Sequence, residues 1–185
     1  RSRVASSFSC RQKAGSSLQA SSTRLCLVLT SRNVTLIVNA SGLEDISYPQ
    51  LDGLQVLHVL VQDQPHAPLR EYFDLVTERI NQNRTGATLV HCTAGRSRSS
   101  ALIMAYLMRS QGLSLRRAHQ LVLEQRPFIR PNAGFWRQLI DLERTLFGRN
   151  TVRMARTPGG VLPEALEDSD LRVRVSVKML TISIS

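Results

Sequence analysis

A cysteine and an arginine six positions apart are the residues of this chain best placed to carry out chemistry. Cys92 opens the run Thr93-Ala94-Gly95-Arg96-Ser97, and Arg98 closes it. Residues 86–90 before it are typical of a short buried strand, and residues 99–108 after it are typical of an apolar helix. A strand that turns through a small-residue loop into a helix directs backbone N–H groups and the positive end of the helix dipole at one point. The pattern therefore predicts an anion site.

The residue types indicate which anion this site would take and what would happen to it. The field that binds an anion also favours a thiolate over a thiol, so we expect Cys92 to be a nucleophile at neutral pH. Arg98 can fork onto two phosphate oxygens, which a lysine cannot do. The alternative for Cys92 is a buried structural cysteine, but a core helix has no need of both Arg96 and Arg98 at its entrance. The loop predicts a phosphate that is bound and then attacked.

This loop resembles the signature of the cysteine-dependent protein tyrosine phosphatases, which is His-Cys, five residues, Arg, and then Ser or Thr. Over about residues 34–163 the chain resembles a small atypical dual-specificity protein phosphatase, closest to the group of dual-specificity phosphatases 14, 18 and 21. The matching stretches are residues 63–68, 86–92, 105–108, 126–127 and 130–140. The resemblance implies hydrolysis of phosphotyrosine and phosphoserine or phosphothreonine on proteins through a cysteinyl-phosphate intermediate, with no metal and no cofactor.

The resemblance also assigns roles beyond the nucleophile. It implies that Asp63, on a Pro-bounded loop after a strand, is the general acid; the alternatives are a solvated turn aspartate at this position, or Asp74 as the acid. It implies that the Ser99 hydroxyl stabilises the leaving thiolate; the alternative is a helix cap, and the two roles are compatible. By the same comparison His91 orders the loop, unless it is only a buried core histidine, and Asn132 braces the loops or caps a helix.

The phosphate-binding groups expected in this interpretation are the backbone N–H groups of the loop and one side chain. The N–H donors belong to Thr93, Ala94, Gly95, Arg96, Ser97 and Arg98, and the side chain is the Arg98 guanidinium. Arg96 stands where the closest group commonly has a small apolar residue, so we expect it to add positive charge at the rim of the site.

Interleaved strand and helix patterns surround this loop. Together they predict an α/β fold, a protein tyrosine phosphatase-like sandwich with a mostly parallel central sheet flanked by helices. The expected strands are residues 34–39 and 54–61, and an amphipathic helix is expected over residues 69–81. Gly112 is expected to end the helix after the loop, Ser114 to cap the next one, and Pro131-Asn132 to open the last.

Composition sets the domain limits. The chain has 185 residues, enough for one domain with a sizeable core, and no stretch is apolar for long enough to span a membrane. Residues 1–23 are rich in Ser and Arg and are expected to be a disordered basic tail, with a transit peptide as the alternative. The catalytic domain is assigned to residues 24–165, and residues 166–185 to a divergent C-terminal tail.

Charge and cysteine usage indicate the partners and the compartment. The net charge of +10 is spread along the chain, and aromatic residues make up only 5%. We therefore expect phosphorylated proteins as partners, with mitogen-activated protein kinases or upstream signalling proteins suggested by the resemblance, and no nucleic acid. Three cysteines favour a reducing compartment, so a cytoplasmic or nuclear location is expected, with mitochondrial targeting as a minor alternative.

Three other functions stay open at this point. One is a phosphate-binding pseudophosphatase or scaffold. The presence of Cys92, Arg98 and Asp63 argues against it, but the departure of residues 1–33 from the opening pattern of the family keeps it open. The others are a nucleic-acid 5′-phosphatase and a phosphoinositide phosphatase of the same fold, which the positive charge permits.

Overall fold

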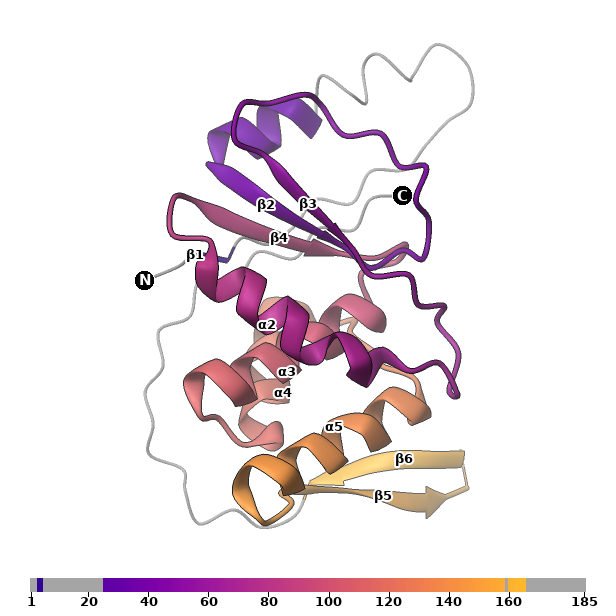
Figure 1. Cartoon of the computed structure of the whole chain (residues 1–185). Coiled ribbons are helices and arrows are strands. Elements are labelled where there is room, and N and C mark those ends of the chain that lie inside the picture. Colours follow the sequence, from indigo (N-terminus) through magenta and orange to yellow (C-terminus); the bar gives the residue numbers. More distant parts are fainter. Residues whose placement is uncertain (1–2, 5–24, 159, 166–185) are drawn as a thin grey trace.

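A four-stranded parallel sheet forms one layer of the molecule (Figure 1). The computed structural model describes residues 3–4, 25–158 and 160–165. The strands lie in the order β1 (Arg3–Val4), β4 (Ala87–His91), β2 (Val34–Asn39) and β3 (Gln55–His58). This arrangement confirms the predicted α/β fold with a parallel sheet, and β2 has the bounds that its β-branched run predicts.

The register of the sheet brings three loops to one edge. Asn39 is paired with His58 of β3 on one side and with His91 of β4 on the other. Because the strands are parallel, the loops that follow these three residues all leave at the carboxyl edge, where ligands bind in open α/β sheets. The loop beginning at Cys92 is one of them.

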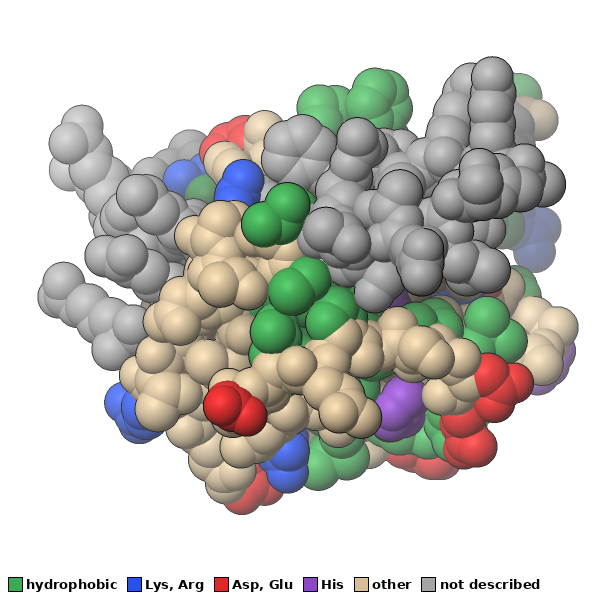
Figure 2. Space-filling model, turned by 90° about the horizontal axis from the view of Figure 1, so that it is seen from above, with side chains coloured by type: hydrophobic (Ala, Val, Ile, Leu, Met, Phe, Trp, Pro, Cys, Tyr) green, Lys and Arg blue, Asp and Glu red, His purple; other side chains and the backbone are tan. Residues whose placement is uncertain are grey.

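One face of the sheet is covered by residues 25–31, which are helical (Figure 1). Leu29 packs there against Ile37 of β2 and Leu89 of β4 in a small apolar cluster. Seen from above in Figure 2, this side shows hydrophobic side chains between polar ones, and the Lys and Arg side chains in view are scattered singly.

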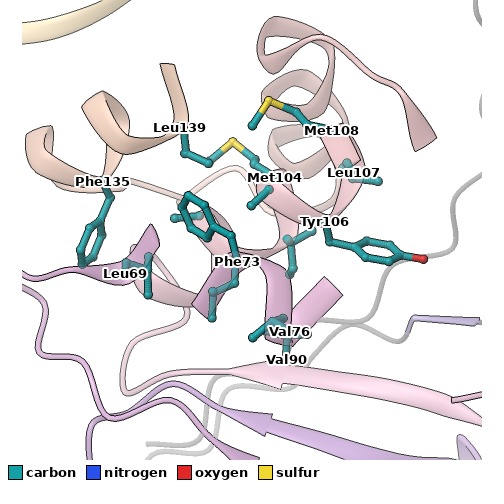
Figure 3. Packing of buried hydrophobic residues seen from close by; sticks show 14 of the residues in the cluster. Leu69, Phe73, Val76, Val90, Met104, Tyr106, Leu107, Met108, Phe135 and Leu139 are labelled. Atoms are coloured by element: carbon teal, nitrogen blue, oxygen red, sulfur yellow. The ribbon is translucent and has the colours of Figure 1, made fainter. Parts of the chain in front are cut away.

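The opposite face is covered by the remaining helices (Figure 1). These are the 3₁₀ turn η1 (Leu69–Tyr72), α2 (Phe73–Gln82), α3 (Arg98–Gln111), α4 (Leu115–Gln125) and α5 (Ala133–Phe147). Figure 3 shows side chains from η1, α2, α3 and α5 pointing into one core, with Val90 of β4 at its sheet side. Every residue of α3 from Arg98 to Met108 is buried, so the helix that follows Cys92 is the centre of this layer.

The helix boundaries follow the predicted signals, with one difference. Gly112 ends α3 in the left-handed region, and the Ser114 hydroxyl caps α4 by accepting from the Arg117 amide. The helix predicted over residues 69–81 instead begins as the 3₁₀ turn η1. There the Arg70 amide donates to Gln138 Oε1 of α5 at 2.7 Å, so a side chain satisfies this first-turn donor.

The second strand is shorter than predicted, and a hairpin was not predicted. The strand expected over residues 54–61 ends at His58, because the Val61 amide turns back to the Val59 carbonyl at 3.0 Å and the chain leaves the sheet. The hairpin of β5 (Val152–Thr157) and β6 (Gly160–Ala165) packs on α5, away from the main sheet (Figure 1).

The predictions for the two tails are largely outside the described residues. Arg3 and Val4, which fall in the expected basic tail, form β1 beside β4. Residues 5–24 and 166–185 are not described, so the assignments made for those ranges stay predictions. In the described part of the chain, no helix has both the length and the apolar composition to cross a lipid bilayer.

Candidate active site

The loop that begins at Cys92 lies at the carboxyl edge of the sheet, between β4 and α3. Cys92 itself is only 1% exposed. Ser97 is the residue before α3, and the Ser100 hydroxyl donates back to the carbonyls of Arg96 and Ser97 at 2.7 and 2.8 Å. These bonds fix the loop on the first turn of its own helix, as expected for a strand–loop–helix anion site.

The structure brings Ser99 into contact with Cys92. Their Oγ and Sγ atoms are 3.3 Å apart, and both side chains are buried. A hydroxyl in this position can donate to a thiolate, so the geometry is compatible with the expected role of Ser99. Ser97, not Ser99, occupies the capping position, and its side chain makes no capping hydrogen bond.

The Arg98 guanidinium is fixed by two neighbouring loops. Its Nη1 donates to the carbonyls of Ser41 and Val61, and its Nη2 donates to Thr93 Oγ1 at 3.1 Å. Its Nε is buried and has no hydrogen-bond partner among the described residues. A buried N–H without a partner is costly, and an anion in the loop could satisfy it.

The loop after β2 supports Arg98, and sequence reasoning missed it. Asn39 Oδ1 accepts from the Ser41 amide at 3.0 Å, and Asn39 Nδ2 donates to the Leu43 carbonyl at 3.0 Å. These bonds hold the Ser41 carbonyl where Arg98 can reach it. The available signal was a polar residue at the end of a buried parallel strand, followed by Ser41-Gly42.

His91 is fully buried beside Cys92 in the sequence, and its partner is Tyr48. The Tyr48 hydroxyl lies 2.6 Å from His91 Nε2. Burial lowers the pKa of His91 to about 4 and raises the pKa of Tyr48, so both groups are neutral at pH 7. At pH 7 His91 is thus a neutral side chain with a hydrogen bond to Tyr48, and its role in ordering the loop stays a prediction. No pattern in the sequence pointed to Tyr48.

The Asp63 carboxylate is hydrogen-bonded to the anion loop and to the start of α5. Its Oδ1 accepts from Ser97 Oγ at 2.6 Å and from Asn132 Nδ2 at 2.8 Å. Asn132 also caps α5, since its Oδ1 accepts from the Phe135 amide at 3.0 Å. Both alternatives weighed for Asn132, loop brace and helix cap, are therefore present together. The Ser97 side chain was missed as a partner of Asp63.

Close packing also sets the position of the loop that carries Asp63. A Cβ atom on Gly134 would overlap the Pro65 carbonyl oxygen, so the first turn of α5 lies directly against this loop. Asp74 lies elsewhere, on α2, where it forms an ion pair of 2.6 Å with Arg109. Its side chain is 73% exposed, as expected for a surface carboxylate.

Two further arginines lie at the site. Arg96 is exposed; its Nε donates to the Phe128 carbonyl at 3.2 Å, and its carbonyl accepts from the Arg130 amide at 2.7 Å. Arg126 is half-buried: burial lowers the pKa of its guanidinium, and interaction with Cys92 raises it. Arg126 therefore lies within electrostatic reach of Cys92, which the sequence did not indicate.

His58 and His119 each contact another side chain. His58 lies 3.3 Å from Asn39 through its Nδ1, and the ring of His119 packs edge-on against Trp136. Over residues 3–4, 25–158 and 160–165, no group of three or more His, Cys, Asp or Glu side chains could hold a metal ion.

Comparison with known proteins gives one consistent result. The model of the family "Dual specificity phosphatase, catalytic domain" matches residues 18–145. Human dual specificity protein phosphatase 14 is 47% identical over 143 residues, covering 76% of this chain and 71% of the relative. Human dual specificity protein phosphatase 21 is 43% identical over 153 residues, covering 82% and 79%. The crystal structure of human DUSP28 matches with a TM-score of 0.60 at 40% identity, covering 65% of this chain and 81% of that one.

Proposed function

Since the chain belongs to the dual specificity phosphatase family, we propose that it is a protein phosphatase that hydrolyses phosphotyrosine and phosphoserine or phosphothreonine. One observation carries the proposal. A buried cysteine, whose sulfur lies 3.3 Å from a serine hydroxyl, begins a loop that ends at an arginine, and the buried Nε–H of that arginine has no partner among the described residues. Such an arrangement suits a nucleophile and a bound phosphate.

In the first step we propose that the Cys92 thiolate attacks phosphorus. The S–P bond forms as the P–O bond to the substrate breaks, and Asp63 gives its proton to the departing oxygen. The N–H groups of the loop and the Arg98 guanidinium hold the other phosphoryl oxygens. Because hydrogen bonds within the chain fix the loop and Arg98, these donors need little reorganisation during the reaction.

In the second step a water molecule attacks the cysteinyl phosphate. The Asp63 carboxylate accepts a proton from this water, the S–P bond breaks, and phosphate leaves. Ser99 donates to the thiolate that is released, since its hydroxyl already lies 3.3 Å from the sulfur.

The hydrogen bonds of Asp63 support both of its roles. Ser97 and Asn132 donate to the same oxygen, Oδ1. Oδ2 accepts no hydrogen bond from the described part of the chain, so it can carry the proton to the leaving group and later accept one from water.

Mitogen-activated protein kinases and their upstream signalling partners stay proposed as substrates, on the strength of the family alone.

Turnover of a small aryl phosphate tests the proposal. Wild-type protein should hydrolyse it and phosphopeptides, and Cys92→Ser should abolish both reactions while the protein still binds phosphopeptide. Cys26→Ser is the matched control, because Cys26 is the other described free cysteine and lies in the helical residues 25–31. We expect this variant to keep full activity.

The same assay separates the proposal from its alternatives. Binding without turnover in wild-type protein would favour a phosphate-binding scaffold. A panel of phosphopeptides, phosphoinositides and RNA 5′ ends would reveal a different substrate class if a lipid or RNA were hydrolysed fastest.

A further inference from the structure

The side chain of Arg96 has a fixed position that the proposed reaction does not use. It projects from the anion loop itself and is exposed. Its Nε donates to the Phe128 carbonyl at 3.2 Å, and the Arg96 backbone is tied to the Arg130 amide at 2.7 Å. The two Nη groups make no hydrogen bond or ion pair with any described residue, so the guanidinium is held at one end and available at the other.

A fixed arginine loses less conformational entropy when it binds a ligand than an ordinary surface arginine does. A mobile side chain loses rotamer freedom when it pairs with a ligand, and this loss offsets much of the gain. Arg96 has lost part of that freedom already, through its bond to the α4–α5 loop. It can therefore present two parallel donors to a carboxylate at a lower entropic cost.

The surroundings of Arg96 suit a peptide better than a small molecule. Phe128 is 77% exposed, more than any other large hydrophobic side chain in the described residues. Arg130 is also exposed, and no carboxylate among the described residues pairs with it or with Arg96. Asp63, which also lies at this site, already accepts from Ser97 and Asn132.

We propose that Arg96, Phe128 and Arg130 form a rim subsite that selects peptides with an acidic residue one or two positions from the phosphoresidue. This inference rests on the proposed function, because the subsite borders the same anion loop. The Arg96 fork pairs with the carboxylate of the substrate, and the Phe128 ring packs against the peptide beside it. Successive residues of an extended peptide are about 3.5 Å apart, and Arg96 is part of the anion loop itself, so its side chain can reach a carboxylate one or two positions from the phosphoresidue.

Paired phosphotyrosine peptides test the subsite. The two peptides differ only in carrying Glu or Gln at the positions flanking the phosphotyrosine, and kcat/KM is measured for each. For wild-type protein we expect the Glu peptide to be favoured about fivefold, the usual upper range for one exposed ion pair. This preference should shrink as ionic strength rises.

Three variants test which residue causes the preference for the Glu peptide. Arg96→Ala should bring the Glu/Gln ratio close to one, whatever it does to the two rates. Arg84→Ala removes the same charge just before β4, at the opposite end of that strand from Cys92, and should keep the wild-type ratio. Phe128→Ala should lower kcat/KM on both peptides about threefold or more and leave the ratio intact, since it removes only apolar contact.

The possible outcomes distinguish a failure of the subsite proposal from a failure of the phosphatase proposal. Equal rates for the two peptides in wild-type protein, or an equal loss of preference in Arg96→Ala and Arg84→Ala, would overturn the subsite while leaving the phosphatase proposal in place. Failure to hydrolyse even a small aryl phosphate would overturn the phosphatase proposal instead. In that case the affinities of the two peptides, measured by fluorescence anisotropy, decide on the subsite without turnover.

Discussion

The hydroxyl oxygen of Ser97 lies 2.6 Å from Oδ1 of Asp63, which joins the anion loop to a loop 34 positions earlier in the chain. The same hydroxyl accepts from the Asn132 amide at 3.2 Å. Ser97 therefore links three separate parts of the chain: the loop after β4, the loop before η1 and the start of α5. Because both hydrogen bonds are made between residues of the chain itself, they can hold the proposed acid in position over the anion loop.

We predict that Ser97→Ala and Asn132→Ser weaken acid catalysis. Each removes one donor to Asp63, and Asn132→Ser keeps a residue that can cap α5. We expect kcat to fall about tenfold on phosphoserine peptides and less on an activated aryl phosphate, because misplacing a catalytic group costs most where the proton is needed. Steady-state kinetics on both substrates measures this. An equal fall on both would contradict a role in placing the acid.

The sequence predicted the loop at the centre of the site better than it predicted the residues that hold this loop and its neighbours in place. The Cys92-to-Arg98 loop could be predicted because its residue types, and the strand and helix around it, are contiguous in the chain. Asn39, Ser41, Tyr48 and the Ser97 side chain could not, because their contacts depend on how the loops after β2, β3 and β4 meet in space. Asn132 was identified through the family resemblance, and the structure adds that Asp63 is its partner.

The same difference applies to the fold. The strand over residues 34–39 and the ends of α3 and α4 follow from local patterns, which are β-branched residues, a glycine and a capping serine. The early end of β3 and the hairpin of β5 and β6 do not follow from local sequence patterns. The first depends on a turn at Val59, and the second has only Val152 buried, so its hydrophobic pattern is weak.

Glu143 provides a prediction on stability. Its carboxylate is fully buried and accepts from the Leu115 amide at 2.6 Å and from the amide and hydroxyl of Thr151 at 2.8 and 2.6 Å. Glu143→Gln replaces one acceptor oxygen by an amide donor facing these N–H and O–H groups. We expect a loss of about 2–4 kcal/mol in the free energy of unfolding, from one or two broken bonds to a charged group.

Denaturant unfolding measures this loss, and Glu124→Gln is the control. Glu124 is exposed and forms an ion pair of 3.9 Å with Arg117, which should contribute under about 1 kcal/mol. Equal effects of the two substitutions would show that the buried carboxylate contributes no more than a surface one.

The buried His91 predicts how stability depends on pH. Burial lowers its pKa to about 4 in the folded protein, whereas in the unfolded chain the value is the ordinary one near 6.5. Between these values the unfolded state binds more protons, so stability is complete above about pH 6.5 and is lost as the pH falls toward 4. We expect unfolding to require about 2 kcal/mol less at pH 5 than at pH 7 from this group.

Urea unfolding at the two pH values measures the change, and His91→Gln should reduce it. His119, whose pKa is also lowered by burial, provides the comparison, and its substitution by Gln should reduce the change less. A pH dependence that stays the same in His91→Gln would rule out His91 as its source.

Substitution of the two candidate acids by asparagine decides between Asp63 and Asp74. Asp63 is bonded to the anion loop through Ser97, whereas Asp74 pairs with Arg109 on the surface of α2 and α3. Asp63→Asn keeps an oxygen that can accept from Ser97 and Asn132 but cannot donate a carboxylic proton. We therefore expect turnover of phosphoserine peptides to fall about a hundredfold or more, the usual cost of losing a general acid. The fall should be smaller on an activated aryl phosphate, whose leaving group scarcely needs a proton.

Asp74→Asn should leave both rates near those of wild type. If Asp74→Asn showed the leaving-group-dependent loss and Asp63→Asn did not, Asp63 would be the wrong acid, and the bond from Ser97 would only hold the loop in place.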